Sequence, residues 1–158
     1  MTEQEHPLIE QIKLAFADVP YPPDGYIGGE NLDRLSGHTW QSVPLDLLLW
    51  LSDEMMFFYI EGFHYFLPAF LLATLRFPDE AGTIPDGLLF AFSYEKGNNN
   101  SRFQFFSLVE NFTSAQARVV RAWLDYYVVW KRDETWKRIP MLMQRYETAI
   151  SFWTYYKT

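Results

Sequence analysis

Aromatic side chains are the feature that most limits the folds open to this chain, because they make up 19% of its 158 residues. The chain contains 14 Phe, 10 Tyr and 6 Trp, and it has no Cys. This composition excludes a disordered tail, a fibre and a disulfide scaffold. The length predicts one domain over residues 1–158, whose core is large enough to need no disulfide or metal.

So many rings exceed what the core of a small helical domain usually holds, since a fully buried ring removes ~150–250 Å² from water. We therefore expect some rings at the surface, above all in segments 21–26 and 152–156 and at Trp40. Exposed Tyr and Trp are typical of protein interfaces. The alternative is that the rings pack inward and leave only Tyr hydroxyls at the boundary.

The spacing of apolar residues predicts a mainly α, single-domain bundle of about five helices, because these residues recur at steps of three to four. Proline and capping residues mark where the helices begin or end. The expected helices cover residues 7–19, 44–61, 67–77, 114–130 and 140–156. The third is expected to carry Pro68 in its first turn, and the fourth opens with the capping box Thr113-Ser114-Ala115-Gln116.

One segment favours strands instead of helices. Residues 88–94 and 102–108 are short, rich in aromatic side chains and imperfectly alternating, and they flank a loop rich in Gly and Asn. This pattern predicts one short β-hairpin near residues 88–108, leaning on the helices for stability.

Charge is unevenly distributed along a chain whose net charge is −7. Residues 1–100 hold fifteen acidic and four basic side chains, whereas residues 101–158 hold five and nine. The acidic part suits a basic partner protein, although net charge also serves solubility alone. Nucleic acid is not expected as a partner, since an acidic protein repels phosphate. The basic run Lys131, Arg138 and Arg145, joined by Arg132 and Lys137, is interpreted as a solvated face rather than a nucleic-acid contact.

The sequence predicts a cytoplasmic protein without a membrane partner. Its first residues lack the basic and small-residue features of a signal peptide. The most apolar stretch, 55–75, is interrupted by Glu61, His64 and Pro68, and its uncharged part is too short for a spanning helix. The absence of Cys agrees with the cytosol.

No catalytic or metal-binding signature is complete. Glu61 and His64 form one Glu-x-x-His pair, whereas a di-metal bundle site needs two pairs and further carboxylates. We therefore expect His64 to be a hydrogen-bonded structural residue and the chain to hold no metal and no cofactor. The chain also lacks a nucleophile motif and a phosphate-binding loop, so we expect it not to be an enzyme.

Two blocks of sequence resemble an uncharacterised family of small, mostly bacterial helical proteins. Residues 63–71 (FHYFLPAFL) match its aromatic-aromatic-Leu-Pro-Ala-aromatic signature. The later Phe106-Ser107-Leu108, with residues 113–116 and 120–124, is similar to its second block. This chain differs by a longer insert between the blocks and an aromatic C-terminal helix. The resemblance implies a single helical domain and a bacterial source, and it implies no activity.

These observations favour a non-catalytic protein-binding domain, most specifically an immunity or antitoxin-like protein that covers the active surface of a basic toxin. The candidate contact residues are the acids Asp24, Glu30, Asp33, Asp53, Glu54 and Glu61, with Tyr26 and Trp40 as aromatic anchors. One alternative is a small-molecule-binding or enzymatic domain with a pocket lined by His64, Tyr65, Phe66 and Tyr127. Another is a structural subunit or homodimer.

Overall fold

The computed structural model describes residues 3–130 and 138–158, and this part of the chain is mainly helical. Within it, the only β pairing is an isolated bridge between Gly28 and Phe58. The α-helices are α1 Pro7–Phe16, α2 Leu45–Trp50, α3 Ile60–Arg76, α4 Ile84–Ala91, α5 Asn99–Val109, α6 Ser114–Trp130 and α7 Pro140–Trp153. Two 3₁₀ turns, η1 Leu32–Leu35 and η2 Met55–Phe57, lie between them.

The predicted hairpin near residues 88–108 is wrong, because that segment contains the end of α4 and all of α5 except its last residue. Asn98 caps α5: its side chain accepts a hydrogen bond from the Ser101 N–H, as an N-cap residue does. The spacing of aromatic residues that suggested strands belongs to a helix with one buried face, which places Phe105 and Val109 in the core. The described residues therefore hold seven α-helices instead of about five.

The second and third predicted helices also have different bounds. α2 ends at Trp50, and the chain turns through η2 before α3 begins at Ile60. Beyond α2, the Ser52 hydroxyl donates to the Leu49 carbonyl and contacts Thr83, a local bond that competes with continuing the helix. Pro68 lies inside α3 rather than in its first turn. An internal proline removes one backbone hydrogen bond of the helix. A buried helix surrounded by packed neighbours can tolerate this loss.

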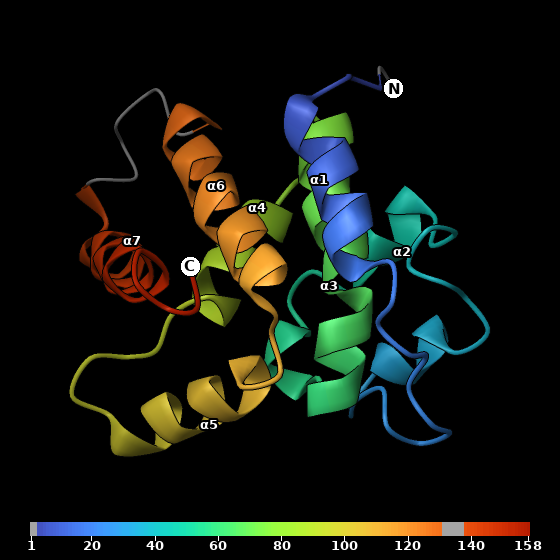
Figure 1. Cartoon of the computed structure of the whole chain (residues 1–158), viewed down its shortest axis with the longest axis horizontal. Coiled ribbons are helices and arrows are strands. Elements are labelled where there is room, and N and C mark those ends of the chain that lie inside the picture. The colour runs from blue at the N-terminus through green and yellow to red at the C-terminus, as the bar shows by residue number, and fades with distance from the viewer. Residues whose placement is uncertain (1–2, 131–137) are drawn as a thin grey trace.

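Helix α3 is the centre of the structure, and its residues from Gly62 to Leu75 are nearly all buried. It packs against α1, α2, α4 and α5, while α6 packs against α1 and α7. Figure 1 shows α1 and α6 side by side at the front, with α3 behind α1 and α5 across the lower edge. No helix in the described ranges is both long enough and apolar enough to cross a bilayer.

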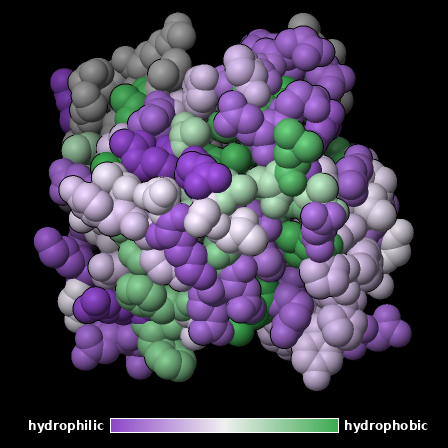
Figure 2. All heavy atoms as spheres, in the orientation of Figure 1, coloured by the Kyte–Doolittle hydropathy of each residue, from purple (hydrophilic) through white to green (hydrophobic). Residues whose placement is uncertain are grey.

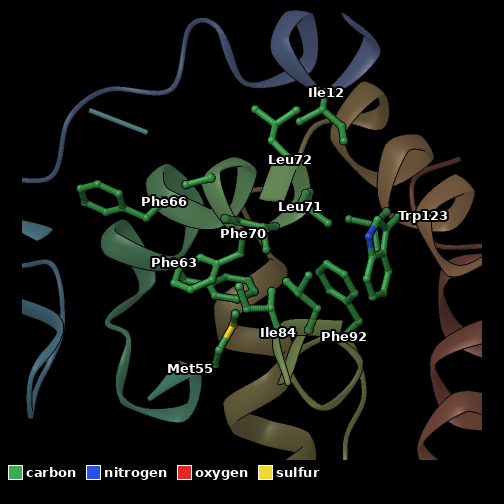
Figure 3. Close-up of a cluster of buried hydrophobic side chains, with 14 of the residues drawn as sticks. Ile12, Met55, Phe63, Phe66, Phe70, Leu71, Leu72, Ile84, Phe92 and Trp123 are labelled. Carbon is green, nitrogen blue, oxygen red and sulfur yellow. The ribbon is translucent and has the colours of Figure 1, made fainter. Parts of the chain in front are cut away.

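Aromatic rings fill much of this core (Figure 3). Phe63, Phe66 and Phe70 of α3 are buried together with Phe92 and Trp123. The Trp123 indole N–H donates to Thr74 Oγ1 at 2.9 Å, so its polar atom is satisfied without water. Most of the aromatic excess among the described residues thus lies inside or at the edge of the core, and the exposed rings form a minority.

One side chain, Gln116, joins three helices at the start of α6. Gln116 Oε1 accepts from the Thr113 N–H at 3.0 Å, and Thr113 Oγ1 accepts from the Gln116 N–H at 3.1 Å, which confirms the predicted capping box. Gln116 Nε2 donates to the Ala15 carbonyl of α1, and Oε1 also lies 2.7 Å from His64 Nε2 of α3. Because Oε1 is a carbonyl oxygen, the His64 Nε2–H is the donor.

The loop before η1 is fastened to the start of α3. The Gly29 N–H donates to the Phe57 carbonyl at 2.8 Å, and the Tyr59 N–H donates to the Ile27 carbonyl at 3.0 Å. Gly62 permits this approach, since a Cβ atom at that position would lie only 1.8 Å from the Ile27 oxygen. This contact brings Tyr26 next to the residues that begin α3.

Candidate functional site

A cleft of about 690 Å³ opens between the segment 55–61 and helix α5. Residues of α4 and of the segment after it, including Phe90 and Ser93, also line the cleft, as does Arg145 of α7. Gly87 helps to bring α4 close to the turn after α2, because a Cβ there would lie 2.8 Å from the Ser52 carbonyl oxygen. The cleft is therefore built by segments that are distant in sequence.

Four large apolar side chains at this cleft are unusually exposed. Tyr26, Met56 and Tyr59 are 53%, 79% and 49% exposed, and Phe103 on the α5 wall is 74% exposed. They are four of the twelve exposed large apolar residues in the described ranges. On the face drawn in Figure 2, hydrophobic side chains reach the surface only in small patches separated by hydrophilic ones. A concentration at one cleft is thus a distinct feature, which we call the apolar rim.

One acidic residue lines the cleft, and three others lie close to lining residues. Glu61 lines the cleft itself, and Asp53 and Glu54 precede η2. Glu30 follows Gly29, which is hydrogen-bonded to Phe57. Asp53, Glu30 and Glu61 are exposed, and we call these three the acidic residues beside the cleft.

The structure divides the sequence-predicted contact residues into groups. Tyr26 and Glu61 meet at the cleft, whereas Asp24 and Asp33 line a separate hollow of about 90 Å³. Glu54 is half-buried and its Oε1 accepts from Asn31 Nδ2 at 3.3 Å, while its Oε2 has no hydrogen-bond partner among the described residues. Glu54 therefore helps to fasten the loop to η2.

The expected exposure of Trp40 is wrong, because this side chain is only 5% exposed and belongs to the core. It follows η1 as the chain returns toward α2, and its ring packs with buried residues instead of facing solvent. Tyr21 and Tyr26 are exposed as expected. In the closing segment Tyr155 is exposed, but Trp153 is buried.

The aromatic pocket considered from sequence is filled by protein. Tyr65, Phe66 and Tyr127 are buried core residues, and neither they nor His64 line the cleft. His64 is hydrogen-bonded to Gln116 and stacks on Phe112, with ring centroids 5.1 Å apart. Burial lowers the pKa of His64; its bond to Gln116 opposes this shift. No group of three or more His, Asp and Glu residues that could hold a metal occurs within residues 3–130 and 138–158.

Arg145 is the cleft residue that sequence reasoning placed elsewhere. Its Nη1 lies 3.5 Å from Ser93 Oγ, and its Cζ lies 4.9 Å from the centre of the Phe90 ring. Burial lowers the pKa of this guanidinium, and the nearby Glu95 raises it. Arg145 does not belong to a solvated stripe, since it lines the cleft. Lys131, Arg132 and Lys137 of the predicted basic run lie outside the described residues.

Sequence reasoning did not predict Phe103 or Met56 as contact residues, because a single exposed apolar residue gives no local signal. Only the packing of α5 against α3 shows that they face one cleft. The cleft offers apolar contact area, the carboxylate of Glu61 and the guanidinium of Arg145. Groups of these types are typical of ligand sites and protein interfaces.

A comparison with curated proteins and a comparison with solved structures each gave no match. A family model described as a family of unknown function, DUF6714, matches residues 26–157. The matched range includes both walls of the cleft and Arg145, and it confirms the expectation of an uncharacterised family. On this match over most of its length, the chain belongs to the DUF6714 family.

Proposed function

We propose that this chain is a non-catalytic protein-binding domain that holds a basic partner protein through the apolar rim and the acidic residues beside the cleft. The observation that carries the proposal is the exposure of Tyr26, Met56, Tyr59 and Phe103 around one cleft. Aromatic and Met side chains are enriched in binding surfaces, where they supply most of the affinity.

Charge favours a basic partner over an acidic one. Glu61 lines the cleft, Glu30 and Asp53 are exposed nearby, and the chain carries a net charge of −7. Complementary charge accelerates encounter, whereas burial of the rim would slow dissociation. In its specific form, the proposal is an immunity or antitoxin-like protein that acts in the cytoplasm and covers the active surface of a basic toxin.

The test is affinity capture from cells of the source organism with the immobilised full chain, followed by binding measurements on each purified candidate. Met56→Ala and Tyr59→Ala remove rim contacts. Leu14→Ala and Tyr155→Ala are matched controls, because those residues are exposed and do not line the cleft. We expect rim variants to weaken binding by at least about tenfold, as hot-spot truncation does. The controls should leave affinity unchanged.

Charge is tested on the same pair of proteins. Glu61→Gln should slow association and reduce its salt dependence, whereas Glu147→Gln on the exposed face of α7 should not. Equal affinities for rim and control variants would refute the proposal. A chain that captures only a second copy of itself, seen by light scattering across concentrations, would replace it with the homodimer.

A further inference from the structure

The α7 residue Arg145 carries a charge into a largely apolar cleft and forms no ion pair with a carboxylate of the described residues. The ion pairs of the described residues join Lys13 to Glu10, Arg76 to Glu3 and Arg121 to Asp125, and none includes Arg145. Its hydrogen bond to Ser93 Oγ is long, at 3.5 Å, and Ser93 itself donates to the Leu89 carbonyl at 2.9 Å. A guanidinium has five N–H donors, so most of its donor capacity is unused by the described residues.

The surroundings hold the guanidinium in place. Its Cζ lies 4.9 Å from the Phe90 ring centre, a cation–π contact that orients the planar group. Glu95 is close enough to raise the pKa of Arg145, but Glu95 Oε2 accepts a bond from Asn98 Nδ2 at 3.4 Å at the start of α5. Glu61 lines the same cleft without forming an ion pair with Arg145.

The size and lining of the cleft suit a small molecule. Its volume of about 690 Å³ lies inside the range of roughly 300–1,000 Å³ that is typical of ligand sites. Apolar side chains such as Phe58, Phe90 and Leu108 line much of it, and Arg145 supplies the positive charge. A carboxylate fits a guanidinium through two parallel N–H···O bonds, which a lone ammonium cannot form.

We propose that the cleft is a ligand site for a small amphipathic carboxylate, whose apolar body lies among the aromatic residues and whose carboxylate pairs with Arg145. This site goes beyond the proposed protein partner, because Arg145 is half-buried within the cleft whereas the apolar rim is exposed to solvent. Ser93 Oγ lies beside the guanidinium and would help to orient it toward the carboxylate.

The experiment compares decanoate with decanol, two probes that share an apolar chain and differ in the head group, by titration calorimetry on the full chain. Both are used below the micelle concentration of decanoate and the solubility limit of decanol. Decanoate is expected to bind at least about tenfold more tightly than decanol, because hydrogen bonds between two charged groups are stronger than those to a neutral hydroxyl. Equal affinities, or no binding of decanoate, would overturn the proposal. This comparison uses the wild-type chain and does not depend on any variant folding.

Arg145→Gln should weaken decanoate binding by at least about tenfold and leave decanol within about twofold. Arg118→Gln is the matched control, since Arg118 is exposed on α6 and does not line the cleft. Arg145→Lys should restore only part of the preference, because an ammonium lacks the bidentate geometry. Unchanged decanoate binding in a folded Arg145→Gln chain would exclude Arg145 from the site. If Arg145→Gln loses decanoate binding but still captures the partner protein, the ligand site is supported and the protein-binding proposal is unaffected.

Discussion

The contact between Gly62 and Ile27 gives the sharpest test of how the loop is held on α3. In a Gly62→Ala variant, the new Cβ would lie 1.8 Å from the Ile27 oxygen and 2.5 Å from its carbonyl carbon. Both atoms belong to the backbone, so no side-chain rotation relieves the clash, and the loop must move away. That movement stretches the bonds from Tyr59 N–H to Ile27 and from Gly29 N–H to Phe57.

The size of the effect follows from three contributions. Overpacking costs about 1–3 kcal/mol, and the loss of two backbone hydrogen bonds costs about 1 kcal/mol each. Alanine stabilises the folded state by about 1 kcal/mol relative to glycine, because it favours the helical conformation more. We therefore expect Gly62→Ala to lower the free energy of unfolding by about 2–4 kcal/mol, measured by urea unfolding followed by circular dichroism and Trp fluorescence.

Gly29→Ala is the matched control, since it lies in the same pair of segments but its Cβ would meet the Phe57 oxygen at 3.9 Å. That distance is an ordinary contact, and this variant should stay within about 1 kcal/mol of the wild type. A Gly62→Ala chain as stable as Gly29→Ala would show that the loop is not held against α3. The position of Tyr26 at the cleft would then need another explanation.

Two further predictions concern buried polar groups. Thr74→Val should cost about 1–3 kcal/mol in urea unfolding, because it leaves the buried Trp123 indole N–H without its acceptor; Thr74→Ser keeps the hydroxyl, and an equal loss in both variants would argue against the hydrogen bond. Burial first, and Lys157 in addition, lower the pKa of His64 below its usual 6.5. Its neutral form therefore stabilises the fold above pH 6.5, and this stability is lost as the pH falls through the lower folded pKa. His64→Gln, which keeps a neutral donor, should flatten the decline of the urea midpoint over that range, and an unchanged decline would assign it to other groups.

Local signals in the sequence predicted the helices that begin with a strong cap. The capping box at Thr113 and the proline at 140 each start a helix where expected. The segment 88–108 could not be assigned in this way, because its rings are buried by α3 and α7 rather than by a neighbouring strand. The short apolar pattern was compatible with both the helical period of 3.6 residues and the strand period of two. Packing against distant segments determined that the segment is helical.

The candidate site was predictable only in part. Tyr26 and Glu61 were marked by their residue types, and the structure brings both to the cleft. Arg145 and Phe103 come from α7 and α5, and their meeting with the start of α3 depends on how the helices pack. The burial of Trp40 shows the same limit, since residue type alone does not say which rings the core encloses.

The three contacts of Gln116 couple the start of one helix to the docking of two others. Glutamate could replace the capping oxygen, yet it has no N–H to donate to Ala15, and its charge would sit beside the half-buried His64. Alanine would remove the bonds to Thr113, His64 and Ala15 together. The first turn of α6 is therefore not an independent folding unit, and its order should rise and fall with the assembly of α1 on α3.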